Sequence, residues 1–112
     1  MKKDQSGVRV TEDFVNKLGK SPIKHWLKKL THEQRIAVLY ELRCLEAYGN
    51  DSNNPYSKPL GKGLFELKTN KYGLRIYFCF RKNKIIRILN AGDKNTQKND
   101  IRIARARLTQ IK

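Results

Sequence analysis

The stretch "GLFELKTNKYGLRIYFCFRKNKIIRILNA" (residues 63–91) decides the fold of this chain. It holds three strand-like runs, 63–68, 74–81 and 84–91, which the short connections "TNKYG" and "KN" separate. The second run alternates with the period of two that a strand with two different faces requires. Its apolar set is Leu74, Ile76, Phe78 and Phe80, and the other set is Arg75, Tyr77, Cys79 and Arg81. Connections this short are typical of hairpins, so the stretch predicts an antiparallel three-stranded meander.

Two amphipathic helices are predicted before the meander. In "SPIKHWLKKL", Ser21 is a suitable N-cap and Pro22 suits the first helical position. "THEQ" has the form of a capping box from Thr31 to Gln34, and the helix that it opens runs to about Tyr48, before "GN". Almost no chain separates the two helices, so they are expected to form a helical hairpin.

The rest of the chain completes an α+β prediction. "VRV" suggests a short strand, Thr11 is expected to cap a short helix through Leu18, 50–63 has turn composition, and a helix is expected over about 98–110. One domain, 1–112, is predicted, with a helical half at about 11–49 and a sheet with the terminal helix at about 63–110. One sheet face is expected to pack on Trp26 and Leu39, and the other to face solvent.

Charge is the strongest compositional signal. The chain has 25 Lys and Arg against 10 Asp and Glu, a net charge of +15. Residues 1–55 hold 10 basic and 7 acidic side chains, whereas residues 56–112 hold 15 and 3. This asymmetry predicts a polyanionic partner for the C-terminal half, with a merely solvated basic surface as the alternative.

Several classes of protein are disfavoured by the same composition. No apolar run approaches the roughly 20 residues of a membrane span, and no apolar segment follows the two N-terminal lysines. Cys44 and Cys79 have no CxxC partner, and His25 and His32 are the only histidines, so buried thiols are expected rather than a zinc site. We therefore expect a cytoplasmic protein with no membrane, metal or cofactor.

The predicted solvent-exposed face carries a polar constellation. If Asn70 faces Gly73 in the first hairpin turn, Lys68 lies across from Arg75, and Glu66 lies across from Tyr77. Lys94, just beyond the third strand, could reach the edge of this patch. Arginine grips phosphate, lysine stabilises developing charge, a carboxylate can take a proton and a phenol can stack on a base. Cross-strand ion pairing on a solvated face is the alternative interpretation.

The order of several motifs resembles a known family. "WLKKL", "YGN", "KPLGKGLFELK", "YGLRIYF" and "AGDKNTQKNDIRIAR" follow one another as in the RelE/ParE superfamily of type II toxin–antitoxin toxins. The similarity covers about residues 21–110 and is nearest to the addiction module killer proteins, which are related to HigB. It implies a RelE-like α+β fold and a toxin paired with an antitoxin, usually a helix-turn-helix repressor in this branch.

The resemblance also implies an activity and a set of residues. Many members cut messenger RNA on the ribosome without a metal, which would make this chain an mRNA interferase with ribosome and mRNA as partners. By position, the catalytic residues would be Lys68 and Arg75, with Glu66 and Lys94 as further members. The residues expected to contact RNA are Lys58, Lys62, Tyr77, Arg81, Lys98, Arg102 and Arg105.

One departure from the family keeps two alternatives open. Relatives often carry a histidine or tyrosine just after the last strand as general acid, whereas this chain has Asn90, Asp93 and Lys94 there. Asp93 and Asp100 are also open to a second interpretation, as turn and helix-cap residues. The alternatives to an RNA-cutting toxin are a ParE-like inhibitor of gyrase and a non-toxic, phage-derived nucleic-acid-binding module.

Overall fold

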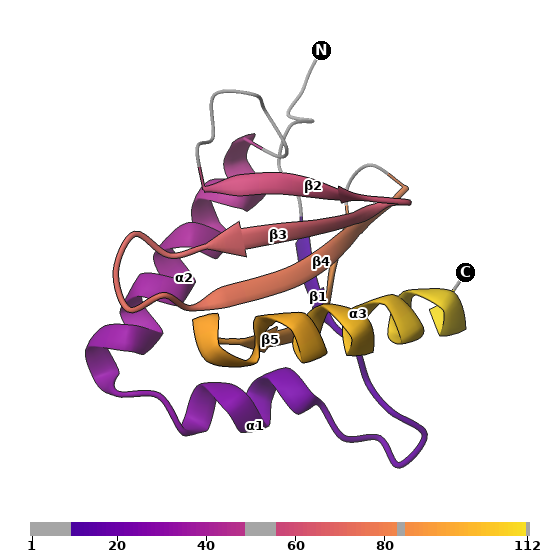
Figure 1. Cartoon of the computed structure of the whole chain (residues 1–112), viewed down its shortest axis with the longest axis horizontal. Coiled ribbons are helices and arrows are strands. Elements are labelled where there is room, and N and C mark those ends of the chain that lie inside the picture. Colours follow the sequence, from indigo (N-terminus) through magenta and orange to yellow (C-terminus); the bar gives the residue numbers. More distant parts are fainter. Residues whose placement is uncertain (1–9, 49–55, 83–84, 112) are drawn as a thin grey trace.

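The protein is a mixed sheet between helices, in a computed structural model that describes residues 10–48, 56–82 and 85–111 (Figure 1). The element order is β1 (Val10–Asp13), α1 (Pro22–Lys28), α2 (His32–Tyr48), β2 (Ser57–Gly61), β3 (Leu64–Lys68), β4 (Arg75–Arg81), β5 (Ile85–Gly92), a 3-10 turn η1 (Lys94–Thr96) and α3 (Gln97–Ile111). The predicted α+β class and the three strands of the meander are confirmed. No helix within these described ranges has the length and hydropathy to cross a membrane.

The sheet has the order β1-β5-β4-β3-β2, with β1 parallel to β5 and the other pairs antiparallel. The edge strand β1 begins at Val10, the last residue of the expected "VRV" strand, whose first two residues lie outside the described part of the chain, and the other edge strand, β2, was not foreseen. The expected helix from Thr11 is wrong, because Val10–Asp13 pairs with Ile85–Ile88 and ends before a loop. β2 lies in a segment that turn composition marked as loop, and Pro59 is tolerated there because an edge strand leaves one side unpaired.

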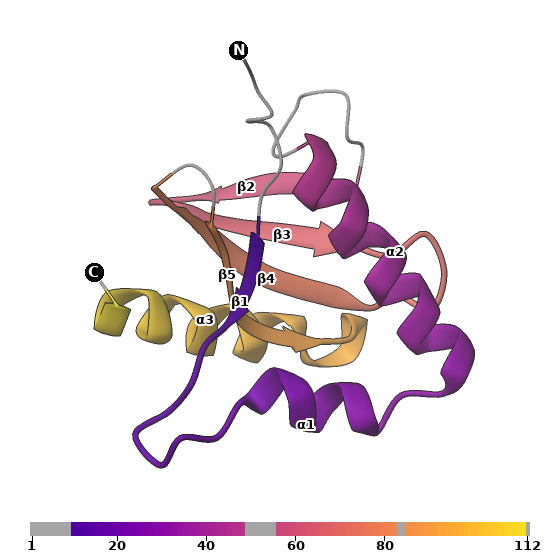
Figure 2. The ribbon, with the colours of Figure 1, turned by 180° about the vertical axis from the view of Figure 1, so that it is seen from behind.

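Helices cover both faces of the sheet, as Figures 1 and 2 show from opposite sides, and each face carries its own core. One core joins α1 and α2 to the apolar set of β4, and its buried members are Ile23, Val38, Leu42, Leu45, Leu67, Leu74, Ile76, Phe78, Ile86, Ile88 and Ala91. The other core joins α3 to the opposite face through Phe14, Leu64, Tyr77, Cys79, Leu89, Ala104 and Leu108. The predicted alternation of β4 is therefore confirmed.

The expectation of a solvent-exposed sheet face is wrong. Ala104 and Leu108 lie on one side of α3, and this side needs an apolar surface to cover it. The sheet supplies that surface, so α3 packs where solvent was expected. On the other face Trp26 packs against the core as predicted, but Leu39 is 43% exposed.

Capping fixes the ends of the helices as the sequence predicts. The Ser21 side chain accepts a hydrogen bond from Lys24 N at 3.2 Å, at the start of α1. At α2 the capping box is complete, because Gln34 N donates to Thr31 Oγ1 at 3.1 Å and Thr31 N donates to Gln34 Oε1 at 2.9 Å. Local capping thus sets the residues at which both N-terminal helices begin.

Candidate functional site

Three cationic side chains meet at one end of the sheet. The register of β3 and β4 pairs Lys68 with Arg75, which confirms the predicted pairing, and β5 places Gly92 on the other side of Arg75. A Cβ built on Gly73 would lie 3.8 Å from Lys94 Cβ and 3.9 Å from Arg75 Nη1, so both side chains flank this glycine. We call Lys68, Arg75 and Lys94 the basic cluster.

A buried carboxylate lies behind the basic cluster. Glu66 is 3% exposed, and its Oε2 accepts a hydrogen bond from Gln97 Nε2 at 2.7 Å. The same carboxylate lies 3.8 Å from Arg75 Nε and 3.7 Å from Lys58 Nζ. Arg75 Nη1 donates to the Gly73 carbonyl at 2.9 Å. The guanidinium of Arg75 is therefore held from two sides, which fixes its orientation in the absence of a ligand.

Gln97 is the member of this site that sequence reasoning missed. It begins α3, whereas Glu66 is on β3, 31 positions earlier in the chain. The segment "NTQKND" is polar throughout, and nothing in it separates Gln97 from its neighbours. Only the packing of α3 on the sheet shows that this amide meets a buried carboxylate.

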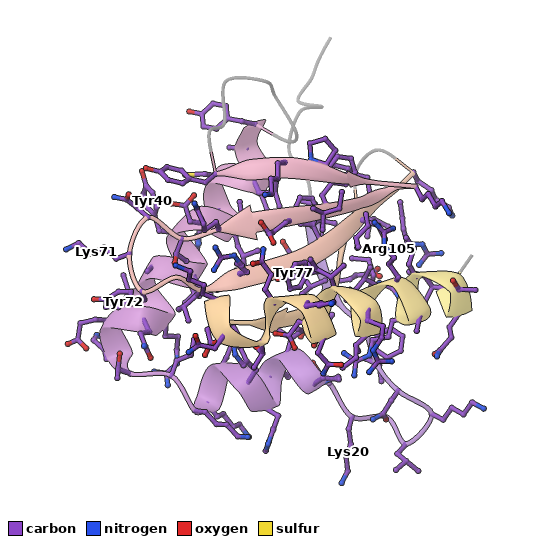
Figure 3. All side chains as sticks on the ribbon, viewed as in Figure 1. Lys20, Tyr40, Lys71, Tyr72, Tyr77 and Arg105 are labelled. Carbon is purple, nitrogen blue, oxygen red and sulfur yellow. The ribbon has the colours of Figure 1, made fainter. Side chains whose placement is uncertain are left out.

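Tyr77 cannot stack on a base as expected. Its side chain is fully buried, and Figure 3 shows it on the middle of β4, beside α3. Burial and the nearby Glu66 and Asp100 carboxylates raise the pKa of Tyr77 well above its ordinary value. Within the described residues, the buried side-chain polar atoms that lack a hydrogen-bond partner are Tyr77 Oη and Arg75 Nε. One of these atoms thus belongs to the basic cluster itself, and the other lies two residues further along β4.

The turn after β5 is built by its own acidic residues. Asp93 caps η1 by accepting from Asn95 N at 2.8 Å and Thr96 N at 3.2 Å. Asp100 is buried and accepts from the Thr96 hydroxyl. The interpretation as a turn and cap residue is confirmed for Asp93, whereas Asp100 lies within α3 and accepts from a side-chain hydroxyl. Together they hold the chain around Lys94 in place beside Arg75.

The other basic residues that were expected to contact RNA lie at two different ends of the sheet. Lys58 faces Glu66 across β2 and β3, near the basic cluster, and Lys98 is exposed on the first turn of α3. Lys62, Arg81 and Arg105 lie at the other end.

Two of the arginines expected to contact RNA already have partners within the chain. Arg105 donates to the carbonyls of Leu60 at 2.7 Å and Gly61 at 3.2 Å, which ties α3 to the edge strand β2. Arg102 is exposed and donates to Asn99 Oδ1 at 2.7 Å. Of the set expected to contact RNA, Lys58 and Lys98 are therefore the best placed to act together with the basic cluster.

The sequence matches a known protein family. The family model described as phage derived protein Gp49-like (DUF891) matches residues 25–109, most of the chain. The chain belongs to the phage-derived Gp49-like family. This family is associated with toxin–antitoxin modules and is related to addiction module killer proteins, and the match is not specific to the RelE/ParE toxins or to HigB. No curated protein matches the sequence.

Proposed function

We propose that this Gp49-like protein is the toxin of a type II toxin–antitoxin module and that it cleaves messenger RNA on the ribosome without a metal. The observation that carries the proposal is the basic cluster, in which Lys68, Arg75 and Lys94 come from three separate segments to one place. The association of the family with toxin–antitoxin modules supports the toxin role. The implied partner is a cognate antitoxin of the helix-turn-helix type, with acidic side chains where it meets the basic half.

The basic cluster is suited to bind a phosphodiester because it combines one cation of fixed orientation with two mobile cations. Arg75 is 12% exposed and is held by Glu66 and Gly73, so it presents a fixed charge that needs little reorganisation as the phosphorane forms. Lys68 and Lys94 are exposed and free to follow the substrate. Fixed and mobile cations together can stabilise the charge that develops on the phosphoryl oxygens.

The proposed reaction is attack by the ribose 2′-oxygen on the adjacent phosphorus. Lys68 relays the 2′-hydroxyl proton to solvent as the new P–O bond forms, and the P–O5′ bond breaks. The ammonium group of Lys94 gives a proton to the departing 5′-oxygen. The products are a 2′,3′-cyclic phosphate and a 5′-hydroxyl. Glu66 is behind Arg75 rather than beside the substrate, so its role is to position that guanidinium.

A second candidate is a nucleic-acid-binding module that does not cut. This candidate is favoured because the histidine and tyrosine side chains that usually transfer protons do not lie at the basic cluster. His25 is on α1 and His32 opens α2, and both helices lie on the face of the sheet opposite to α3. Tyr77 is buried. Binding without cleavage would need only the charge of the C-terminal half.

The decisive experiment is single-turnover cleavage of a message on programmed ribosomes, with and without EDTA. Lys68→Ala and Arg75→Ala should each slow cleavage by about two to four powers of ten, because each removes a group that acts in the transition state. The double variant should lose less than the two effects combined, because both groups serve one transition state. Lys20→Ala is the matched control, since Lys20 is exposed on the loop before α1, and Figure 3 shows it well away from Lys71 and Tyr72 in the connection between β3 and β4.

Three outcomes separate the candidates. Products ending in cyclic phosphate and 5′-hydroxyl, formed equally with EDTA, support the nuclease. Folded Lys68→Ala and Arg75→Ala variants that cut at the parental rate would exclude the basic cluster as the catalyst. Salt-sensitive RNA binding with no cleavage by the parent would establish the second candidate, with log affinity falling almost linearly with log salt concentration.

A further inference from the structure

The face of α2 that points away from the sheet is unexpectedly apolar. Ile36 is 51% exposed, Leu39 is 43% exposed and Tyr40 is 65% exposed. The buried face of the same helix, which contains Val38 and Leu42, already packs in the core. A helix with one apolar face needs only one partner, whereas α2 has a second apolar face that the described elements leave exposed.

The spacing of this second face is that of a helix–helix seam. Successive intervals of three, four, three and four residues join Glu33, Ile36, Tyr40, Arg43 and Ala47, and all five are exposed. Such a repeat keeps one stripe facing a partner helix along four turns. We call these five residues the α2 seam.

The α2 seam is complementary to itself. Consider an antiparallel pair whose two-fold axis crosses α2 at the level of residue 38. In this pair Glu33 of each copy lies opposite Arg43 of the other. The same axis places Ile36 opposite Tyr40, so that the apolar residues meet in the middle and one ion pair closes each end. We propose that the α2 seam is the dimer interface of this protein, occupied by the α2 of a second copy.

The surface beside the α2 seam adds to this interface. A groove of about 460 Å³ runs between α2 and the β3–β4 connection, and its lining includes Ile36, Tyr40, Tyr56 and Tyr72. Tyr72 is 48% exposed and is held in the left-handed conformation, with φ of 72°. Tyr40 and Tyr72 lie on the same side of the molecule (Figure 3). A second copy thus finds apolar surface beyond the helix itself.

Charge favours this face for contact between two copies. Two chains of net charge +15 repel one another, but the α2 seam carries one acidic and one basic residue. Most of the excess charge lies in residues 56–112, and α3 covers the opposite face of the sheet from α2. Pairing through α2 therefore keeps the two basic halves apart and leaves the basic cluster of each copy free for RNA.

The size of the α2 seam sets the expected affinity. From residue 33 to residue 47 the seam is roughly 21 Å long at 1.5 Å per residue. A single helix pair with part of a groove is at the small end of specific interfaces, which bury about 800 Å² per partner. We expect a dimer dissociation constant on the order of tens of micromolar.

The test is sedimentation equilibrium of the full chain from about 5 to 300 μM in 0.15 M salt, where the Debye length of about 8 Å screens the repulsion. Glu33→Arg and Arg43→Glu should each raise the dimer dissociation constant about tenfold, since each variant turns two ion pairs into repulsive pairs. The double variant Glu33→Arg/Arg43→Glu should return to the parental constant. Lys24→Glu is the control, because Lys24 is exposed on α1 and the charge change equals that of Arg43→Glu.

The results that would overturn the proposal are clear. A parent that is monomeric at 300 μM shows that a second copy does not occupy the α2 seam. A dimer that both single variants leave intact shows that the copies meet elsewhere. A dimer that both single variants weaken but that the double variant does not restore excludes the antiparallel register. Circular dichroism of each variant confirms that the exposed changes leave the fold intact.

Discussion

Gly92 is the position at which the structure makes its sharpest prediction. A Cβ added there would lie 1.9 Å from Asp100 Oδ2, 2.8 Å from Asp100 Cγ and 2.8 Å from Thr96 Oγ1. Gly92 ends β5 and Asp100 is in the first turns of α3, so the glycine lets the helix start lie directly against the strand. Gly92→Ala should therefore destabilise the protein strongly, although the substitution adds only one methyl group.

The size of the expected destabilisation follows from the displacement of the Asp100 carboxylate, which the new methyl group would require. The Asp100 carboxylate is 9% exposed and accepts from Thr96, so it has no solvent into which to retreat. Overpacking of this kind costs about 1–3 kcal/mol. Loss of a hydrogen bond to a buried charged group adds about 1.5–3 kcal/mol. A total of about 2.5–6 kcal/mol is a large part of the roughly 5–15 kcal/mol that stabilises a domain of this size.

The assay is urea unfolding at pH 7, followed by circular dichroism, with a double-mutant cycle. Gly92→Ala alone should show the full loss in free energy of unfolding, and its Tm should fall by about 15 °C. In an Asp100→Ala background the two Asp100 atoms are gone and the exposed Thr96 hydroxyl, released from Asp100, can turn away, so the same substitution should cost less than about 1 kcal/mol. The reasoning is refuted if Gly92→Ala costs the same in both backgrounds or less than about 1 kcal/mol in the parent.

Two further predictions concern the half-buried Arg107 and the buried Glu41. Arg107 Nη1 donates to the Leu89 carbonyl at 2.8 Å and to Asn90 Oδ1 at 3.2 Å. Arg107→Lys should lower the free energy of unfolding by about 1–3 kcal/mol, because an ammonium group does not reproduce the planar fork, and a urea midpoint equal to the parent's would contradict this role. Burial raises the pKa of the Glu41 carboxyl above its ordinary value of 4.5, so the stability that it contributes is complete below pH 4.5 and is lost as the pH rises through the folded pKa. Glu41→Gln should therefore raise Tm at pH 7 but not at pH 4, and a gain of the same size at both pH values would count against a buried, ionised Glu41.

Local patterns were enough to predict the centre of the sheet and the helix starts. The alternation of apolar residues in β4 depends only on the period of a strand, and the hairpin turn then determines which residues pair. For this reason Lys68 and Arg75 could be paired in advance. Capping at Ser21 and Thr31 is equally local, because a cap and its partner are three residues apart.

Other members of the candidate site needed contacts between distant segments. Tyr77 was expected on an exposed face, because alternation separates two faces without indicating what covers either of them. Gln97 could not be linked to Glu66, because no local rule joins the start of a helix to a strand 31 residues earlier. Lys94 was placed near the patch by its position after a strand, but its approach to Arg75 depends on the packing at Gly92.

The sequence by itself determined the class of the fold, the register of the catalytic candidates and the strongly basic C-terminal half, since these depend on near neighbours in the chain or on composition. Only the tertiary structure decided that α3 covers the second face of the sheet, that β1 and β2 extend its edges and that the α2 seam stays exposed. The physical reason is that an apolar face must be buried against some surface, but its periodicity does not specify which one. Which surface buries it depends on all the apolar surfaces of the chain together, and here α3 covers the sheet face that was predicted to be exposed.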